Sequence, residues 1–142
     1  MGQPQQLIVP GRFESLTEIV AFVTRAAREA GLNDDEVFHV EMAVDEACSN
    51  IIEHAYAAQA GDIDLGCACP EAGQFEVVIR DSGPPFDPAH IEPRNVNTVD
   101  LDDVDEGELG LYFMRKLMDE VRFEFVPGQG NTLTMIKLAK TD

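Results

Sequence analysis

Three polar side chains in one stretch of the sequence are spaced for chemistry on a helix. Glu46, Asn50 and His54 follow one another at intervals of four residues, so on a helix they form one stripe that turns by about 40° at each step. A carboxylate and an amide one turn apart can hold a hard cation and a water, because Mg²⁺ prefers oxygen ligands and keeps part of its hydration shell. A solvated helix face has the same pattern. We interpret His54 as a packing and hydrogen-bonding residue.

A second polar feature follows an apolar stretch that reads as a strand, from Phe75 to Arg80. Asp81 comes directly after it and Gly83 two residues later. An aspartate at a strand end can accept a hydrogen bond from an exocyclic amine, and a glycine lets a ring approach the backbone closely. The segment Asp-Ser-Gly-Pro is also ordinary turn chemistry, so on its own this feature is weak.

Two glycines three residues apart, Gly107 and Gly110, lie at the start of a third apolar pattern. Leu111, Met114 and Leu117 recur at helical spacing, which predicts a helix from about Gly110 to Glu120. Free backbone N–H groups at a helix start, beside glycines that allow close approach, form a phosphate-binding corner. A single Gly-x-x-Gly is common, so this feature is also weak alone.

The elements that must position these residues follow from periodicity and turn chemistry. The predicted elements are strands at 5–9, 63–68, 75–80, 121–126 and 132–138 and helices at about 16–30, 34–56 and 110–120. Short turns join the last four strands in pairs. The pattern therefore predicts one domain over residues 1–142, an α+β two-layer sandwich with helices on one face of a mostly antiparallel sheet.

The charge of the chain limits its partners. Its 27 acidic and 10 basic residues leave a net charge of −17, a field that repels DNA and anionic lipid surfaces. No stretch is long and apolar enough for a membrane helix, and the first residues do not resemble a signal peptide. We therefore expect a cytoplasmic protein that does not bind nucleic acid or membranes directly. A basic protein, or an anion with a divalent cation, remains compatible with the charge.

The three cysteines are expected to be reduced thiols. Cys67 and Cys69 are spaced to lie on one side of a strand. A Cys-x-Cys pair can start a metal site, but no second cysteine pair or histidine cluster completes four ligands. Cys48 is interpreted as a small buried apolar residue.

Taken in order, these features resemble the ATPase superfamily that gyrase, heat-shock chaperones and histidine kinases share. Within it, the sequence is most similar to the small anti-sigma-factor serine kinases. The segments that carry the resemblance are 41–56 (EMAVDEACSNIIEHAY), 81–88 (DSGPPFDP) and 107–121 (GELGLYFMRKLMDEV). The resemblance extends from about Phe13 to Lys137.

The resemblance implies a histidine kinase-like ATPase fold, in which three helices cover an open sheet and ATP lies between the helices and a lid at about 84–109. It implies that Asn50 coordinates Mg²⁺ and that Glu46 is the general base toward a serine hydroxyl. Phosphoryl transfer needs little more than such a carboxylate and a cation. The nucleotide contacts that the resemblance assigns are the adenine amine at Asp81, space for the ring at Gly83, the phosphate corner at Gly107, Gly110 and Leu111, and adenine support at Thr132 or Thr134.

The implied function is a partner switch. Such a kinase is a homodimer that binds a sigma factor and phosphorylates an anti-anti-sigma antagonist on serine. An alternative is a weakly catalytic or non-catalytic module that sequesters a partner. A detached histidine-kinase ATPase domain is disfavoured, because we expect no dimerisation helix with a phosphorylatable histidine before it.

The intact Glu46 and Asn50 favour the kinase, whereas departures from the family pattern favour the alternative. Pro85 stiffens the entry to the lid, and Glu108 occupies a position that is often glycine. Carboxylates in or beside the lid outnumber its one cation, Arg94, and repel a polyanion unless Mg²⁺ or a basic partner offsets them. These carboxylates are Asp100, Asp102, Asp103, Asp105, Glu106 and Glu108.

Overall fold

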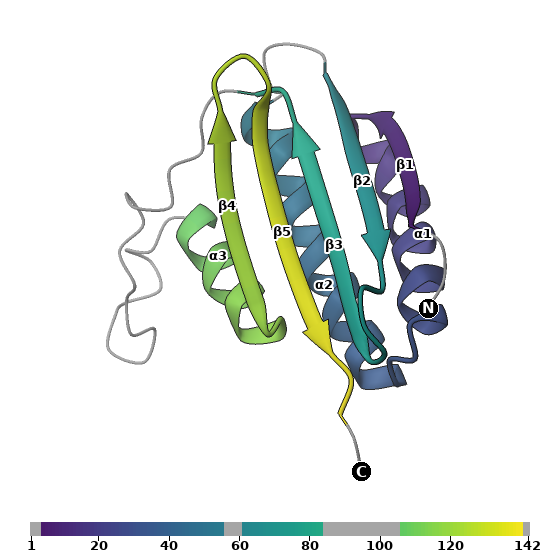
Figure 1. The fold of residues 1–142 in the computed structure, drawn as a ribbon. Helices are drawn as coiled ribbons and strands as arrows, with labels where there is room; N and C mark the ends of the chain where they lie inside the picture. The colour runs from purple at the N-terminus through teal and green to yellow at the C-terminus, as the bar shows by residue number, and fades with distance from the viewer. Residues whose placement is uncertain (1–3, 56–60, 84–105, 141–142) are drawn as a thin grey trace, which may run out of the picture.

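The computed structural model describes residues 4–55, 61–83 and 106–140. They form a two-layer α+β fold, in which the helices cover one face of a five-stranded antiparallel sheet (Figure 1). The strand order is β1-β2-β3-β5-β4. The strands are β1 Gln5–Pro10, β2 Asp62–Ala68, β3 Gln74–Asp81, β4 Glu120–Val126 and β5 Gly130–Leu138, and the helices are α1 Leu16–Glu29, α2 Asp34–Asn50 and α3 Glu106–Leu117. The predicted fold class is confirmed.

The core lies between the sheet and the helices. Alternate residues of β3, from Phe75 through Val77 and Ile79, are buried, and so are Val40 and Val44 of α2. Such alternation is expected of an antiparallel sheet with one covered face. Full burial of a side chain of this size stabilises the fold by about 1.5–3 kcal/mol, so the central strands hold the helix layer in place.

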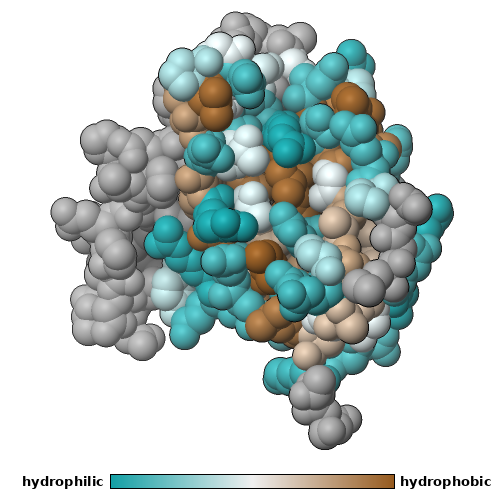
Figure 2. Space-filling view, in the orientation of Figure 1, coloured by the Kyte–Doolittle hydropathy of each residue, from teal (hydrophilic) through white to brown (hydrophobic). Residues whose placement is uncertain are grey.

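The other face of the sheet is not covered by the described helices. Figure 2 looks onto this face and shows mostly hydrophilic residues with a few apolar ones between them. The strand register places Arg80, Thr132 and Arg122 on it. Side chains on this face therefore point away from any site between the helices and the sheet.

A capping box starts α2. The Asn33 side chain accepts a hydrogen bond from the Glu36 N–H, and the Glu36 side chain accepts one from the Asn33 N–H, both at 2.8 Å. The second carboxylate oxygen of Glu36 accepts a hydrogen bond from the Lys140 N–H at 2.7 Å. Glu36 therefore links the first turn of α2 to the residues that follow β5. It also pairs with the N–H of the N-cap residue at the start of α2.

The bounds of α2 and α3 differ from those predicted. The α-helical part of α2 ends at Asn50 and continues as a π-helical turn, Ile51–Ala55, and Tyr56 lies outside the described residues. Helix α3 begins at Glu106 rather than near Gly110, and it ends at Leu117. It ends there because the Asp119 N–H donates to the Ile136 carbonyl at 2.8 Å and so joins the sheet.

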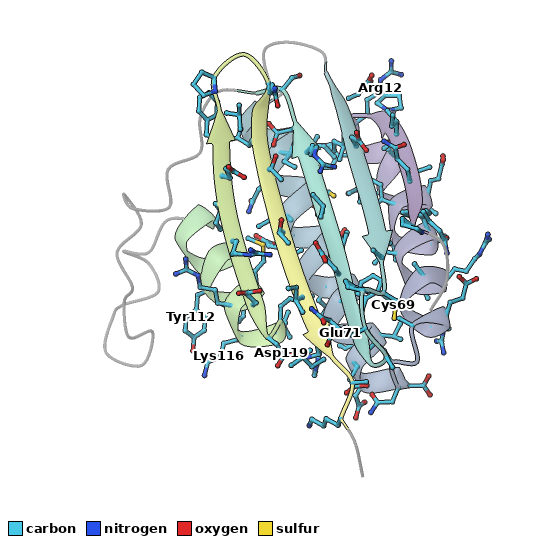
Figure 3. The ribbon with its side chains drawn as sticks, in the orientation of Figure 1. Arg12, Cys69, Glu71, Tyr112, Lys116 and Asp119 are labelled. Atoms are coloured by element: carbon cyan, nitrogen blue, oxygen red, sulfur yellow. The ribbon has the colours of Figure 1, made fainter. Side chains whose placement is uncertain are left out.

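The far end of α3 is fixed to the sheet by polar contacts. Lys137 Nζ donates to the Leu117 carbonyl at 2.6 Å, and Asp119 accepts a hydrogen bond from the Leu138 N–H. Figure 3 shows Tyr112, Lys116 and Asp119 near this end of α3. Arg115 and Lys116 lie in the last turn of α3, where basic residues complement the helix dipole.

The cysteine thiols are reduced, and two are deeply buried. Burial raises the pKa of Cys67 to about 12, and the Cys69 thiol donates to the Glu71 carbonyl. Both cysteines line a cleft of about 30 Å³ beside the C-terminal end of α1, which has room for about one water. Among residues 4–55, 61–83 and 106–140, His, Cys, Asp and Glu side chains form no group of three that could hold a metal.

None of the helices that the structure describes combines the length and the apolar character needed to cross a bilayer.

Candidate nucleotide site

Glu46 and Asn50 lie on the side of α2 that is turned toward α3. Helix α2 lies between α1 and α3 (Figure 1). Glu41 marks the α1 side, because it accepts a 2.7 Å hydrogen bond from Thr24 of α1. Five residues correspond to roughly 140° around a helix, so Glu46 is well separated from that side. Both Glu46 and Asn50 are half-buried, as expected of side chains at the edge of a helix–helix contact.

The helix widens directly after Asn50. The Ile51 N–H donates to the carbonyls of both Ala47 and Cys48, and Ile51–Ala55 form a π-helical turn. Such turns inside α-helices are frequent at functional sites. The His54 side chain lies outside the described residues, so its interpretation stays a prediction.

Asp81 is the last residue of β3 and is only 8% exposed. Its Oδ1 accepts hydrogen bonds from the Gly83 N–H at 2.8 Å and from Asn131 Nδ2 at 3.1 Å. In the described part of the chain no cationic side chain pairs with it. A carboxylate has about four acceptor positions, so the donors of the described residues leave part of this group's acceptor capacity unused.

The Asp81 carboxylate lies near the C-terminal half of α2. Burial first, and then the negative charges of Asp45 and Asp81, raise the pKa of Cys48 to about 12. Cys48 is fully buried one turn after Val44, as the sequence predicted. The strand-end aspartate and the end of the helix that carries Glu46 and Asn50 therefore share one region of the molecule.

Gly130 lets β5 start against the end of β3. Its φ is +110°, a left-handed conformation that favours glycine. A Cβ there would collide with the Asp81 carbonyl oxygen and would lie 2.8 Å from the Ser82 Cα. This close approach brings the next residue, Asn131, within hydrogen-bonding distance of Asp81.

Thr132, the predicted adenine support, does not share a face with Asp81. Asp81 pairs with Asn131 in the β3–β5 ladder, whereas Arg80 pairs with Thr132 and Val78 with Thr134. Because side chains alternate along a strand, both threonines lie on the open face of the sheet. Asn131 takes the position beside Asp81. The sequence did not predict this contact, because the predicted strand begins at Thr132, two residues after the observed start of β5.

The predicted glycine corner falls inside α3. Gly107 is the second residue of the helix, and Gly110 is the fifth. A helix leaves its first N–H groups without intrahelical partners, so the Gly107 N–H remains a candidate phosphate donor. The Gly110 N–H is a turn too late for that role. The Leu111 side chain and residues 84–105, with Pro85 and Arg94, lie outside the described residues.

The comparison with known families decides the identity of the fold. The histidine kinase-like ATPase domain family matches residues 9–137. The chain belongs to this family. The match includes α2, Asp81, Gly83 and α3, so the features that are weak one by one lie together in a single family domain.

Curated relatives within the family carry a kinase name. The serine-protein kinase RsbW of Bacillus licheniformis is 32% identical over 133 residues, which are 90% of this chain and 81% of the relative. The serine-protein kinase RsbW of Bacillus thuringiensis (strain Al Hakam) is 28% identical over 136 residues, 93% of this chain and 82% of the relative. The resemblance to this group of histidine kinase-like ATPases is confirmed.

Two solved structures share the fold. The RsbU and RsbW domains of Rv1364c from Mycobacterium tuberculosis match with a TM-score of 0.69 at 18% identity, covering 99% of this chain and 34% of that chain. The histidine kinase domain of the Erythrobacter litoralis EL346 blue-light activated histidine kinase matches with a TM-score of 0.53 at 14% identity, covering 88% of this chain and 59% of that chain. At these identities the likeness concerns the fold.

Proposed function

We propose that this histidine kinase-like ATPase domain is a cytoplasmic, ATP-dependent protein serine kinase. The observation that carries the proposal is Asp81, a buried carboxylate with hydrogen bonds from Gly83 and Asn131 to one oxygen and no cationic partner in the described part of the chain. Such a group fits the exocyclic amine of adenine, which donates N–H to the remaining acceptor positions. Gly83 has no side chain to obstruct the ring.

The other proposed nucleotide contacts lie on the helices. Asn50 is the proposed oxygen ligand for Mg²⁺, which supplies positive charge that offsets the phosphates when Mg·ATP is bound. Gly107 contributes a backbone N–H from the first turn of α3. Gly110 is proposed to let the phosphates approach closely because it has no side chain, with Leu111 beside it, whereas its own N–H lies beyond the unpaired donors of the first turn.

Glu46 is the proposed catalytic residue. Its carboxylate accepts the proton of the serine hydroxyl, the serine oxygen forms a bond to the γ-phosphorus, and the bond from that phosphorus to the bridging oxygen breaks, so that ADP leaves. General base catalysis of this kind typically contributes about 10²–10⁴-fold to a rate. The position of Glu46 on the α3 side of α2, one turn from Asn50, supports this role.

The proposed partners follow the named relatives, which are serine-protein kinases. We propose that the chain forms a homodimer, binds a sigma factor, and phosphorylates an anti-anti-sigma antagonist on serine. The net charge of −17 favours basic surfaces on these partners.

Calorimetric titration with Mg·ATP tests the nucleotide site. Asp81→Asn replaces an acceptor oxygen by an N–H₂ group, and a hydrogen bond to a charged group contributes about 1.5–3 kcal/mol, so we expect about 10- to 100-fold weaker binding. Asp64→Asn is the matched control, because Asp64 lies on the open face of the sheet. Equal ATP affinity in Asp81→Asn and wild type would refute the adenine contact.

Phosphate transfer to the antagonist separates the kinase from a sequestering module. Glu46→Gln keeps the size of the side chain and removes the base, so we expect ATP binding to remain and transfer to fall about 10²-fold or more. A wild-type protein that binds ATP and its partner without transferring phosphate would support the non-catalytic module, which the acidic residues of 100–108 favour.

A further inference from the structure

Two large apolar side chains on α2 are exposed although a helix of this length has a well-filled buried face. Phe38 is 56% exposed and Met42 is 46% exposed. They are four residues apart, so they lie next to each other on successive turns. Neither belongs to the hydrophobic core or to the apolar residues packed against it.

Phe38 and Met42 continue the row that carries the proposed catalytic residue. Phe38, Met42, Glu46 and Asn50 are spaced four residues apart, and each step turns by about 40°. The row therefore winds from the outer surface of α2 at Phe38 to the α3 side at Asn50. The apolar pair is a direct extension of the site, one and two turns from Glu46.

The surroundings of the pair are acidic. Asp35 is three residues before Phe38, and Glu41 and Asp45 follow Phe38 and Met42 by three residues each, a spacing that places side chains side by side. Residues 34–50 contain no Lys or Arg. The nearby cation Arg28 pairs with Asp34 at 3.0 Å. A complementary ligand therefore combines apolar side chains with positive charge.

The spacing of the row also matches an extended peptide. Met42 and Phe38 lie about 6 Å and 12 Å from Glu46 along the helix axis, at 1.5 Å per residue. An extended chain advances about 3.3 Å per residue, and alternate side chains share one side. When the serine of such a peptide lies at Glu46, the peptide side chains two and four residues away lie on the same side of the peptide as the serine. They therefore reach Met42 and Phe38.

We propose that Phe38 and Met42 are the docking site for the segment of the protein substrate that carries the phosphorylated serine. This segment is extended, has apolar residues two and four positions from the serine, and carries Lys or Arg between them, whose long flexible side chains bend toward the carboxylates that flank the pair. The proposal rests on the proposed kinase function, because it takes Glu46 as the residue that meets the serine.

The probe is a synthetic eleven-residue peptide with a central serine, leucine two and four residues away on both sides, and lysine at the other positions. Its symmetry makes it independent of chain direction. Two matched peptides replace the leucines by alanine or the lysines by glutamate. Binding to the full chain with Mg²⁺ and a non-hydrolysable ATP analogue is measured by fluorescence anisotropy.

We expect the leucine–lysine peptide to bind at least tenfold more tightly than either matched peptide. The double variant Phe38→Ala/Met42→Ala should lose at least fivefold in affinity for it. Ile8→Ala is the matched control, because Ile8 is 57% exposed on the open face of the sheet, and it should bind as wild type does. Unfolding midpoints check that the variants fold.

Equal binding by the double variant and wild type would overturn the docking site. So would equal binding of the leucine and alanine peptides, because binding would then be electrostatic only. ATP affinity, measured in the same samples, separates the two proposals. Selective peptide binding that is lost in the double variant supports the docking site, whether or not phosphate is transferred. Absence of phosphate transfer counts against the kinase function and not against the docking site.

Discussion

Two buried carboxylates, Glu36 and Asp81, lie toward opposite ends of α2 and differ in how their oxygens are used. Glu36 is 3% exposed, and both its oxygens accept backbone hydrogen bonds, from Asn33 and Lys140. Both hydrogen bonds that Asp81 accepts from residues described by the structure go to one oxygen. A satisfied buried carboxylate stabilises the fold, whereas one with acceptor capacity left is suited to a ligand. Burial alone therefore does not distinguish the two carboxylates, whereas the number of oxygens that accept hydrogen bonds from the described residues does.

The pKa of Glu36 fits its structural role. The hydrogen bond from the Asn33 backbone is the largest cause that lowers this pKa, and the Lys140 N–H and the charges of Lys137 and Lys140 act in the same direction. Desolvation opposes them but does not reverse the shift. The folded state therefore favours the ionised carboxylate.

The largest expected effect is a difference between the Asp81 and Glu36 variants in how much Mg·ATP stabilises them against unfolding. A ligand at about 100 times its Kd stabilises a protein by about 2.7 kcal/mol. We expect Mg·ATP at that excess over the wild-type Kd to raise the unfolding midpoint of wild type and Glu36→Ala, and to raise that of Asp81→Asn much less. Differential scanning fluorimetry with and without ATP measures this. If ATP raised the unfolding midpoint of Asp81→Asn as much as that of wild type, Asp81 would not differ from Glu36 in ligand binding, and the proposed contrast would be wrong.

Glu36→Ala should reduce stability without a nucleotide. Loss of a capping interaction costs about 1 kcal/mol, with a range of about 0.5–2 kcal/mol, and the unpaired Lys140 N–H adds to this cost. Urea unfolding gives the free energy, with Glu29→Ala as a control for an exposed glutamate. An unchanged midpoint would show that the contacts of Glu36 do not stabilise the fold.

Asn131→Ala should weaken ATP binding by a smaller factor than Asp81→Asn. It removes one of the two donors that orient the Asp81 carboxylate, and a net hydrogen bond contributes about 0.5–1.5 kcal/mol, so we expect about a 2- to 10-fold higher Kd. Asn131→Thr keeps a donor and should recover part of the affinity. Thr132→Val, on the opposite face, should bind as wild type does. If Thr132→Val alone weakens binding, the predicted assignment to Thr132 is right after all.

The smallest effect concerns pH. Folding lowers the pKa of Glu36 from its ordinary value of 4.5. The ionised carboxylate therefore stabilises the fold at pH values above about 4.5, and this stabilisation is lost as the pH falls through the lower pKa of the folded state. Glu36→Gln should therefore be less stable than wild type at pH 7, and the difference should shrink as pH falls from 5 toward 3. Urea unfolding over this range measures it. A difference that does not change with pH would exclude the charge as its cause.

The sequence predicted the parts of the site that depend on local pattern. The four-residue spacing from Glu46 to Asn50, the strand that ends at Asp81, and the α+β order of elements need only helical or strand periodicity. These positions agree with the structure. The functional roles of Glu46, Asn50 and Asp81 remain proposals that the experiments above address.

The sequence did not predict the parts that depend on contacts between distant residues. Asn131 reaches Asp81 across 50 positions, and Lys140 reaches Glu36 across 104. The contact between Asn131 and Asp81 depends on strand register, because a shift of one residue would turn the Asn131 side chain to the other face of the sheet. The start of α3 was also missed, because glycines lower helix propensity, while the acidic residues beside Gly107 favour a first helical turn.

The contact between Glu36 and Lys140 has a practical consequence. The Lys140 backbone is held beside the first turn of α2, and Asp81 lies near the last turns of the same helix, whose 17 residues span about 25 Å. An affinity tag or fluorescent label fused after residue 142 is therefore attached far from Asp81. Immobilisation through such a tag leaves the end of the protein that carries Asp81 oriented toward the solution.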